Sequence, residues 1–123
     1  MNTKTINIQV LALLGDAVLS LYIREQLLEK GINNANKLQE LSIAYVSAKG
    51  EVKILKKLIE NNILTEEEID VIKRGRNNKK ENHPKNTDIL TYKLSTGFEA
   101  LLGELYLNNK ERLKEILNLI EVE

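Results

Sequence analysis

The sequence contains no cysteine and no tryptophan, and it has only one proline, one histidine and six glycines among 123 residues. The absence of cysteine excludes disulfides, thiolate metal sites and thiol nucleophiles, and it agrees with a reducing compartment. The single histidine, His83, lies among lysines and asparagines, so a histidine metal cluster or a catalytic triad is excluded. The scarcity of proline and glycine favours helical structure.

Charge of either sign is not in excess, because 18 Lys and Arg balance 18 Asp and Glu. Any affinity for a polyanion must therefore come from an uneven distribution of charge. Hydrophobic residues make up 42% of the chain and charged residues 29%, which is typical of soluble globular proteins. We expect a single domain over residues 1–123 with a real core.

Hydrophobic periodicity predicts an all-α protein of about six helices, and no strand pattern appears. Gly31 and Gly75 are expected to end the first and fourth helices, and Thr65 with Glu68 forms a predicted capping box. The expected helices are residues 8–30, 35–41, a longer helix with Val52, Leu55, Leu58 and Ile59 on one face, a helix starting at residue 65, and residues 87–107 and 110–120.

Asp16 is the only charged residue between Ile6 and Ile23. Lys4 before an apolar run resembles a signal peptide or a membrane span, but a central carboxylate makes this segment too polar for either. We therefore expect a buried helix of a cytoplasmic protein without a membrane segment. Burial of an unpaired carboxylate costs several kcal/mol, which points to a structural hydrogen bond, a salt bridge or a cation site.

Glu99 is the second carboxylate in an apolar setting, within STGFEALLGELYL (residues 95–107). It falls beside the predicted core stripe, so we expect it to be half-buried. Glycines near both carboxylates indicate close approach of another helix or a ligand. Two such carboxylates would suit Mg²⁺, although a helix cap or an internal salt bridge would also explain them. The core stripe is Phe98, Leu101, Leu102 and Leu105, and the glycines are Gly15, Gly97 and Gly103.

Five motifs, in order, are LALLGDAVLSLYIR, VSAKGE, KRGRNNK, PKNTD and YKLSTGFEALLGELYL. Together they resemble the Mini-III branch of the ribonuclease III family, which has the nuclease domain without a double-stranded-RNA-binding domain. The resemblance implies an all-α homodimeric endoribonuclease that cuts double-stranded RNA with Mg²⁺, with Mn²⁺ as a substitute. It also implies maturation of the large-subunit ribosomal RNA precursor, with a ribosomal protein as a candidate further partner.

Carried over by position, Asp16 and Glu99 match catalytic metal ligands of the family. Full-length ribonuclease III enzymes have two further acids, which are replaced here by Ala12 and Thr96. Asp88 is a candidate compensating metal ligand, and its alternative role is to stabilise the start of a helix. The missing acids also motivate the alternative function, a non-catalytic RNA-binding or protein-interaction module of the same fold.

Basic residues concentrate between residues 73 and 85, just before the helix that carries Glu99. Such a run is either solvated surface or a phosphate-binding surface for double-stranded RNA, and the low aromatic content argues against base stacking. The candidate RNA-binding residues are Lys49, Lys73, Arg74, Arg76, Lys79, Lys80 and Lys85. The expected chemistry is metal-assisted phosphodiester hydrolysis.

The first helix also predicts a homodimer, because its apolar residues occupy more than one face. Part of this surface is therefore expected to meet a second copy of the chain. The residues in question are Leu11, Leu14, Val18, Leu19 and Tyr22.

Overall fold

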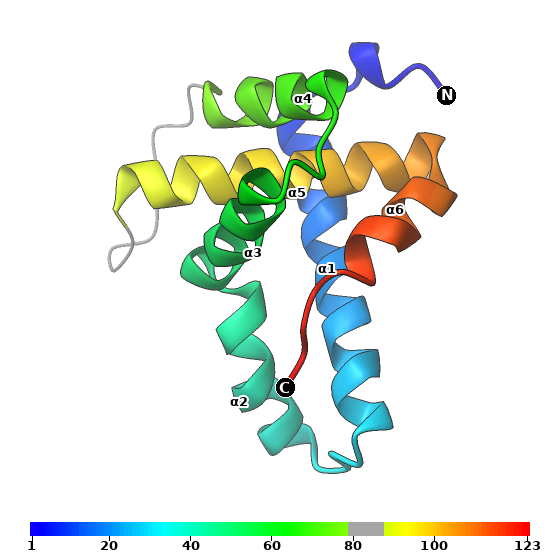
Figure 1. The fold of residues 1–123 in the computed structure, drawn as a ribbon, viewed down its shortest axis with the longest axis vertical. Helices are drawn as coiled ribbons and strands as arrows, with labels where there is room; N and C mark the ends of the chain where they lie inside the picture. Colours follow the sequence, from blue (N-terminus) through cyan, green and yellow to red (C-terminus); the bar gives the residue numbers. More distant parts are fainter. Residues whose placement is uncertain (79–87) are drawn as a thin grey trace.

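The computed structural model describes residues 1–78 and 88–123, and every regular element in these ranges is helical. The six α-helices that the sequence predicts are present, and a short 3₁₀ helix that it did not predict, η1 (Thr3–Thr5), precedes them (Figure 1). The α-helices are α1 (Ile8–Glu29), α2 (Ala35–Val46), α3 (Ala48–Glu60), α4 (Glu66–Arg76), α5 (Ile89–Asn108) and α6 (Lys110–Leu117).

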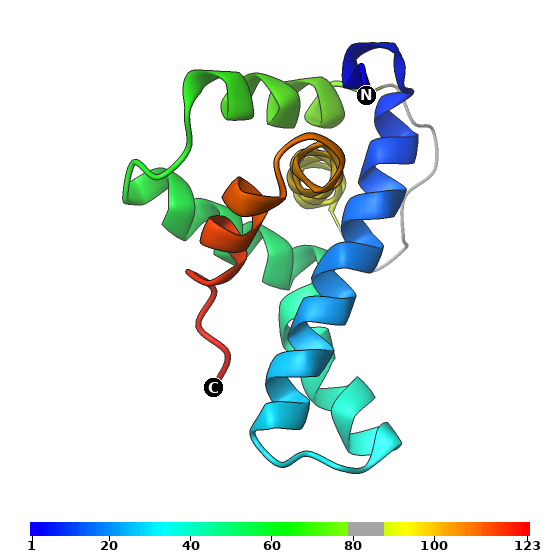
Figure 2. The same ribbon diagram turned by 90° about the vertical axis from the view of Figure 1, so that its right-hand side faces the viewer.

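Helix α5 is the centre of the structure. Figure 2 looks along its axis, with α1, α3, α4 and α6 arranged around it. The predicted core stripe is confirmed, since Phe98, Leu101 and Leu102 are completely buried and Leu105 nearly so. Burial of each such side chain contributes roughly 1.5–3 kcal/mol to folding. A helix buried on most of its circumference explains why the 95–107 segment is apolar on more than one face.

Helices α1 and α5 cross in backbone contact. A Cβ atom on Gly15 would overlap the carbonyl of Glu99, and a Cβ atom on Gly103 would overlap the carbonyl of Leu11. The two mid-helix glycines are therefore required by the close approach, as the sequence predicts. This contact holds the residue after Gly15, Asp16, beside the turn of α5 that carries Glu99.

Helix ends agree in part with the sequence-based expectations. Gly31 follows α1 with a left-handed φ of 95°, and the Thr65–Glu68 capping box is present. Helix α2 continues to Val46, beyond the expected end at residue 41, because Ser47 is both its C-cap and the N-cap of α3. Helix α6 ends at Leu117, earlier than expected.

Two expectations within α3 and α4 were wrong. Gly75 lies inside α4, where a Cβ atom would come within 2.6 Å of the Cα atom of Gly97. This glycine is explained by helix packing rather than by a helix stop. Ile59 is half exposed, unlike Val52, Leu55 and Leu58, which are buried.

The first helix is less buried than its sequence suggests. Leu11 and Leu19 are fully buried, but Leu13 is 72% exposed, and Asp16 is also exposed. The expectation that Asp16 is buried was therefore wrong, because the helix places Asp16 on a face that α5 leaves open. None of the described helices is long and apolar enough to cross a membrane.

Arg112 of α6 connects three segments of the chain. Its guanidinium donates to both carboxylate oxygens of Glu68 at 2.8 and 2.9 Å and to the carbonyl of Ile63 at 2.7 Å. The hydrogen bond from Arg112 is the main reason that the pKa of Glu68 lies below its ordinary value of 4.5. Glu68 is nearly buried, so the pair contributes more than an exposed ion pair would.

Replacement of Arg112 by Met is expected to lower the free energy of unfolding by about 2 kcal/mol at neutral pH, because Glu68 loses its partner. The difference from wild type should shrink as the pH falls below 4.5, since a depressed carboxylate pKa stabilises only while the group is ionised. Urea unfolding across pH measures this. Glu115→Ala, which removes only an exposed partner of Arg112, is the control and should change little. Equal stability of Arg112→Met and wild type would contradict this role.

Candidate active site

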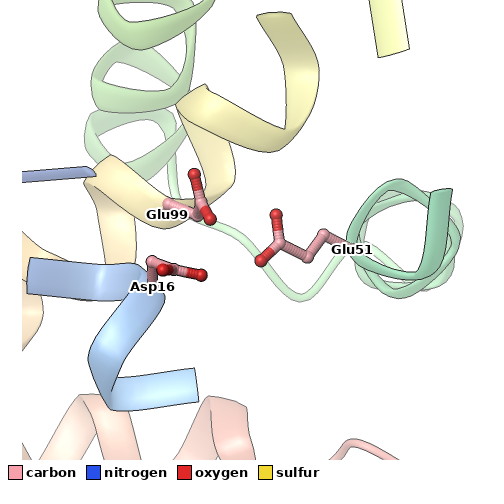
Figure 3. A group of neighbouring side chains, drawn as sticks. All are labelled: Asp16, Glu51 and Glu99. Carbon is pink, nitrogen blue, oxygen red and sulfur yellow. The ribbon is translucent and has the colours of Figure 1, made fainter. Parts of the chain in front are cut away.

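Three carboxylates from three helices meet where α1 and α3 approach α5. Asp16 comes from α1, Glu51 from α3 and Glu99 from α5, and one oxygen of each lies within 4.8 Å of the others. Figure 3 shows the three side chains pointing toward a common centre. The fold thus brings together the two carboxylates predicted from sequence and adds Glu51.

Local structure explains how α3 presents Glu51. The side chain of Ser47 accepts a hydrogen bond from the backbone N–H of Gly50 at 3.1 Å and caps α3. Glu51 follows in the first turn, on the same side as the buried Leu55 and Leu58. Because that side packs against α5, the carboxylate points into the molecule.

Glu51 carried a signal that the sequence reasoning missed. Positions 51, 55 and 58 follow helical spacing, so a carboxylate occupies the apolar stripe of an otherwise amphipathic helix. Glu51 also ends the motif VSAKGE. The spacing of the apolar residues could therefore have identified it as a third buried acid.

The three carboxylates differ in burial. Glu51 is only 1% exposed, Glu99 is half-buried as expected, and Asp16 is exposed. Burial, followed by the charge of Glu99, a hydrogen bond with Glu99 and the charge of Asp16, raises the pKa of Glu51 to about 11. Its Oε2 atom is buried without a hydrogen-bond partner in the part of the chain that the structure describes.

These features fit a divalent cation. Hard cations such as Mg²⁺ and Mn²⁺ prefer carboxylate oxygens, and a cation would supply the missing partner of Glu51 Oε2. It would also reverse the electrostatics of the cluster, since a nearby positive charge favours ionised carboxylates. Asp16, Glu51 and Glu99 are the residues that could hold it.

Asp88 lies elsewhere, at the start of α5. Its side chain accepts hydrogen bonds from the backbone N–H and the hydroxyl of Thr91, at 2.9 and 2.8 Å, and caps the helix. The hydrogen bond from the backbone N–H of Thr91 is the largest contribution that lowers the pKa of Asp88 below its ordinary value. Asp88 is exposed and is not part of the three-carboxylate group. Of its two expected roles, the structure therefore shows the stabilisation of a helix start.

A hollow of about 380 Å³ adjoins the carboxylates. Asp16 and Glu99 border it, and the positions that are acidic in full-length ribonuclease III enzymes, Ala12 and Thr96, also line it. The hollow is therefore less acidic than it would be with carboxylates at those two positions. Within residues 1–78 and 88–123, Gln9, Leu13 and Tyr92 also line it.

Predicted RNA-binding residues fall in two places. Lys73, Arg74 and Arg76 occupy the last turn of α4, which the Gly75–Gly97 contact holds against α5 two residues before Glu99. Lys49 is exposed in the first turn of α3, two residues before Glu51. The other three predicted residues, Lys79, Lys80 and Lys85, lie outside the described residues.

Comparison with known proteins gives consistent results. A family model described as the ribonuclease III domain matches residues 9–110. Mini-ribonuclease 3 of Streptococcus pneumoniae is 42% identical to this chain, and the match covers 95% of this chain and 92% of the relative. Mini-ribonuclease 3 of Staphylococcus aureus is 45% identical to this chain, and the match covers 95% of this chain and 88% of the relative. A crystal structure of a Fusobacterium nucleatum protein has a TM-score of 0.83 and 35% identity, covering 97% of this chain and 96% of the other.

Replacement of Glu51 by Gln is expected to raise the melting temperature in EDTA, because it removes an acid whose raised pKa reduces stability at neutral pH. Because the pKa of Glu51 is about 11 in the folded state, Glu51 lowers the stability of wild type increasingly as the pH rises above the ordinary pKa of a glutamate. The variant should lack this pH dependence of stability. Millimolar Mg²⁺ or Mn²⁺ should stabilise wild type by mass action and the variant much less.

Differential scanning fluorimetry measures both effects. Glu60→Gln, an exposed glutamate on the same helix, is the matched control and should respond to cations as wild type does. If Glu51→Gln and wild type gain equal stability from the cations, Glu51 is not a ligand.

Proposed function

Since this chain belongs to the Mini-ribonuclease III branch of the ribonuclease III family and is an endoribonuclease, we propose that it hydrolyses double-stranded RNA with Mg²⁺ held by Asp16, Glu51 and Glu99. Members of this family act on double-stranded RNA and generally use a divalent metal. The observation that carries the proposal is the convergence of three carboxylates, one of them buried with an oxygen that has no hydrogen-bond partner among the described residues. Mn²⁺ is the expected substitute, as it also prefers oxygen ligands.

The carboxylates have different roles because they differ in burial. Glu51 holds the ion from within the protein, Glu99 links the buried and open sides, and the exposed Asp16 faces the substrate. A divalent cation bound there lowers the pKa of water and offsets charge on the phosphate and the leaving oxygen. Water is the nucleophile, so the reaction needs no protein nucleophile, which suits a chain without cysteine.

The basic last turn of α4 is proposed to bind RNA phosphates. Lys73 and Arg74 are exposed and Arg76 is half-buried, and the turn packs beside the segment that carries Glu99. Phosphate contacts position a duplex without reading its sequence. Lys49 is proposed to join this surface from α3, and Lys79, Lys80 and Lys85 from the segment after α4.

The biological substrate is proposed to be the large-subunit ribosomal RNA precursor. Support comes from the high identity to Mini-ribonucleases 3 along nearly the whole chain and from the family resemblance of the motifs. Residues 1–123 are proposed to form one nuclease domain that acts in the cytoplasm, where this precursor is made. A ribosomal protein that presents the RNA is the proposed further partner.

A homodimer is also proposed, but through a surface other than the one first expected. Leu11 and Leu19 are buried within the chain, and Leu14, Val18 and Tyr22 are partly covered. Exposed apolar side chains lie instead in the first half of α1 and at the start of α5. They are Val10, Leu13, Ile89 and Leu90. A twofold pairing through this surface would give two sites for the two strands of one duplex.

Light scattering of the wild-type protein at micromolar concentration should give the mass of a dimer. Leu13→Glu should shift the mass toward the monomer, because it places a charge in the proposed interface. Leu28→Glu, at the other end of α1 and also exposed, is the control and should remain dimeric. A monomeric wild type would contradict the dimer.

Cleavage of duplex RNA tests the proposed function directly. Wild type should cut in Mg²⁺ and not in EDTA, while Asp16→Asn and Glu99→Gln should each lower the rate by more than about two orders of magnitude, because the amides do not hold the cation. Asp70→Asn, at an exposed position of α4, should cut normally. Inactive wild type that still binds duplex RNA would instead support a non-catalytic RNA-binding module.

Replacement of Arg74 and Arg76 by Ala should weaken binding to unrelated duplexes to a similar extent. It should also reduce the salt dependence of the binding constant by roughly one released counterion for each lost phosphate contact. Titrations at several salt concentrations measure the slope. Lys37→Ala with Lys114→Ala, which removes two exposed charges from α2 and α6, is the control. A wild-type affinity and slope for the arginine variant would show that this turn is only solvated surface.

A further inference from the structure

The hollow beside Asp16 and Glu99 has a chemical character that cation binding does not explain. The buried carboxylate of Glu51 is not among its lining residues. Away from Asp16 and Glu99, the polar groups that the described residues contribute to its lining are the amide of Gln9, the phenol of Tyr92 and the hydroxyl of Thr96. A neutral lining of this kind is suited to an uncharged polar group rather than to a second cation or a phosphate.

Thr96 has a defined hydrogen-bonding state. Its Oγ1 donates to the backbone carbonyl of Tyr92 at 3.0 Å, one turn earlier in α5. The hydroxyl proton is thus used, and the lone pairs of Oγ1 remain able to accept. The side chain is 8% exposed, so it is held firmly by its surroundings. A ligand that donates a hydrogen bond to Thr96 would complete this site.

Gln9 offers complementary chemistry from α1. It lies on the same helical face as Asp16, two turns earlier, and borders the same hollow. Its side-chain amide has two donor hydrogens and an acceptor oxygen. Gln9 and Thr96 together can therefore donate to and accept from one hydroxyl group.

In double-stranded RNA, the uncharged polar group nearest to a phosphate is the 2′-hydroxyl of the adjoining ribose. It is both donor and acceptor, and it distinguishes RNA from DNA. A volume of about 380 Å³ lies within the range of small-ligand sites and leaves room for a sugar. The hollow begins at Asp16 and Glu99, which face the phosphate that is cut under the proposed function.

We propose that this hollow binds the ribose next to the scissile phosphate, and that Gln9 and Thr96 hydrogen-bond to its 2′-hydroxyl and select RNA at this position. The assignment rests on the proposed function, because it takes Asp16 and Glu99 as the site of cleavage. Ala12 contributes only a methyl group to the lining, which leaves space that a longer side chain would fill. Gln9 and Thr96 act here as substrate-binding residues.

The test combines protein variants with modified substrates. A short duplex RNA with one cleavage position is compared with duplexes that carry 2′-deoxyribose at either nucleotide flanking that position. Wild type should lose roughly fivefold to a hundredfold in kcat/KM on one of the two modified duplexes, as expected for the loss of both hydrogen bonds to the 2′-hydroxyl. Gln9→Ala and Thr96→Val should each cut the unmodified duplex more slowly and lose less than wild type on the modified one, because each variant keeps only one of the two hydrogen bonds.

Control variants separate recognition of the sugar from general damage. Thr96→Ser retains the hydroxyl and should keep the discrimination, as should Ser20→Ala, one turn beyond Asp16 on α1 and not part of the hollow. Melting temperatures check folding, and the exposed Gln9 provides a second position where substitution leaves the core intact. Wild type that cuts all three duplexes equally, or variants that keep the full wild-type discrimination, would overturn the proposal.

The same assay distinguishes failure of this proposal from failure of the proposed function. Cleavage of unmodified duplex by wild type without discrimination would reject only the ribose site. Equilibrium binding in Ca²⁺ is measured in parallel for each duplex, with the same order of affinities expected. Wild type that neither cuts the duplexes nor binds them differently would overturn both.

Discussion

The backbone contact between α1 and α5 is the constraint on which the other features depend. Gly15 packs against the carbonyl of Glu99, and Gly103 packs against the carbonyl of Leu11, with no room for a methyl group at either glycine. Metal ligands must be placed within a few tenths of an ångström. A wider crossing would separate Asp16 from Glu99 and change the hollow between the helices. The most buried helix of the protein therefore also sets the geometry of its site.

The three carboxylates reduce the folding stability of the protein locally. Glu51 is almost completely buried beside two other acids, and its pKa is raised to about 11. A hydrophobic residue at position 51 would match the stripe formed by Leu55 and Leu58. Strongly shifted pKa values of this kind concentrate at functional sites, where a bound ligand offsets their cost. In the adjoining hollow, the described polar groups beyond Asp16 and Glu99 are uncharged, and this contrast separates a place for a cation from a place for a sugar.

Glycine illustrates the limits of reading structure from sequence. Gly31 ends α1 with a left-handed backbone, as expected. Gly75 looks equivalent in the sequence, but it lies within α4 against Gly97 and holds the basic turn beside α5. Each glycine directly follows a basic residue, Lys30 or Arg74, and lies two residues before a pair of asparagines, so local pattern does not distinguish them. The difference arises from a helix some twenty residues further along the chain.

The sequence by itself determined the helical class, most helix positions, the core of α5 and the half-buried Glu99, because these follow from periodicity within single segments. Motif order also identified the family. Only the tertiary structure decided that Asp16 is exposed, that Asp88 caps α5 and that Glu51 completes the acidic cluster. Those outcomes depend on which face of one helix another helix covers. That choice is made by packing between segments far apart in the chain, and no single segment contains it.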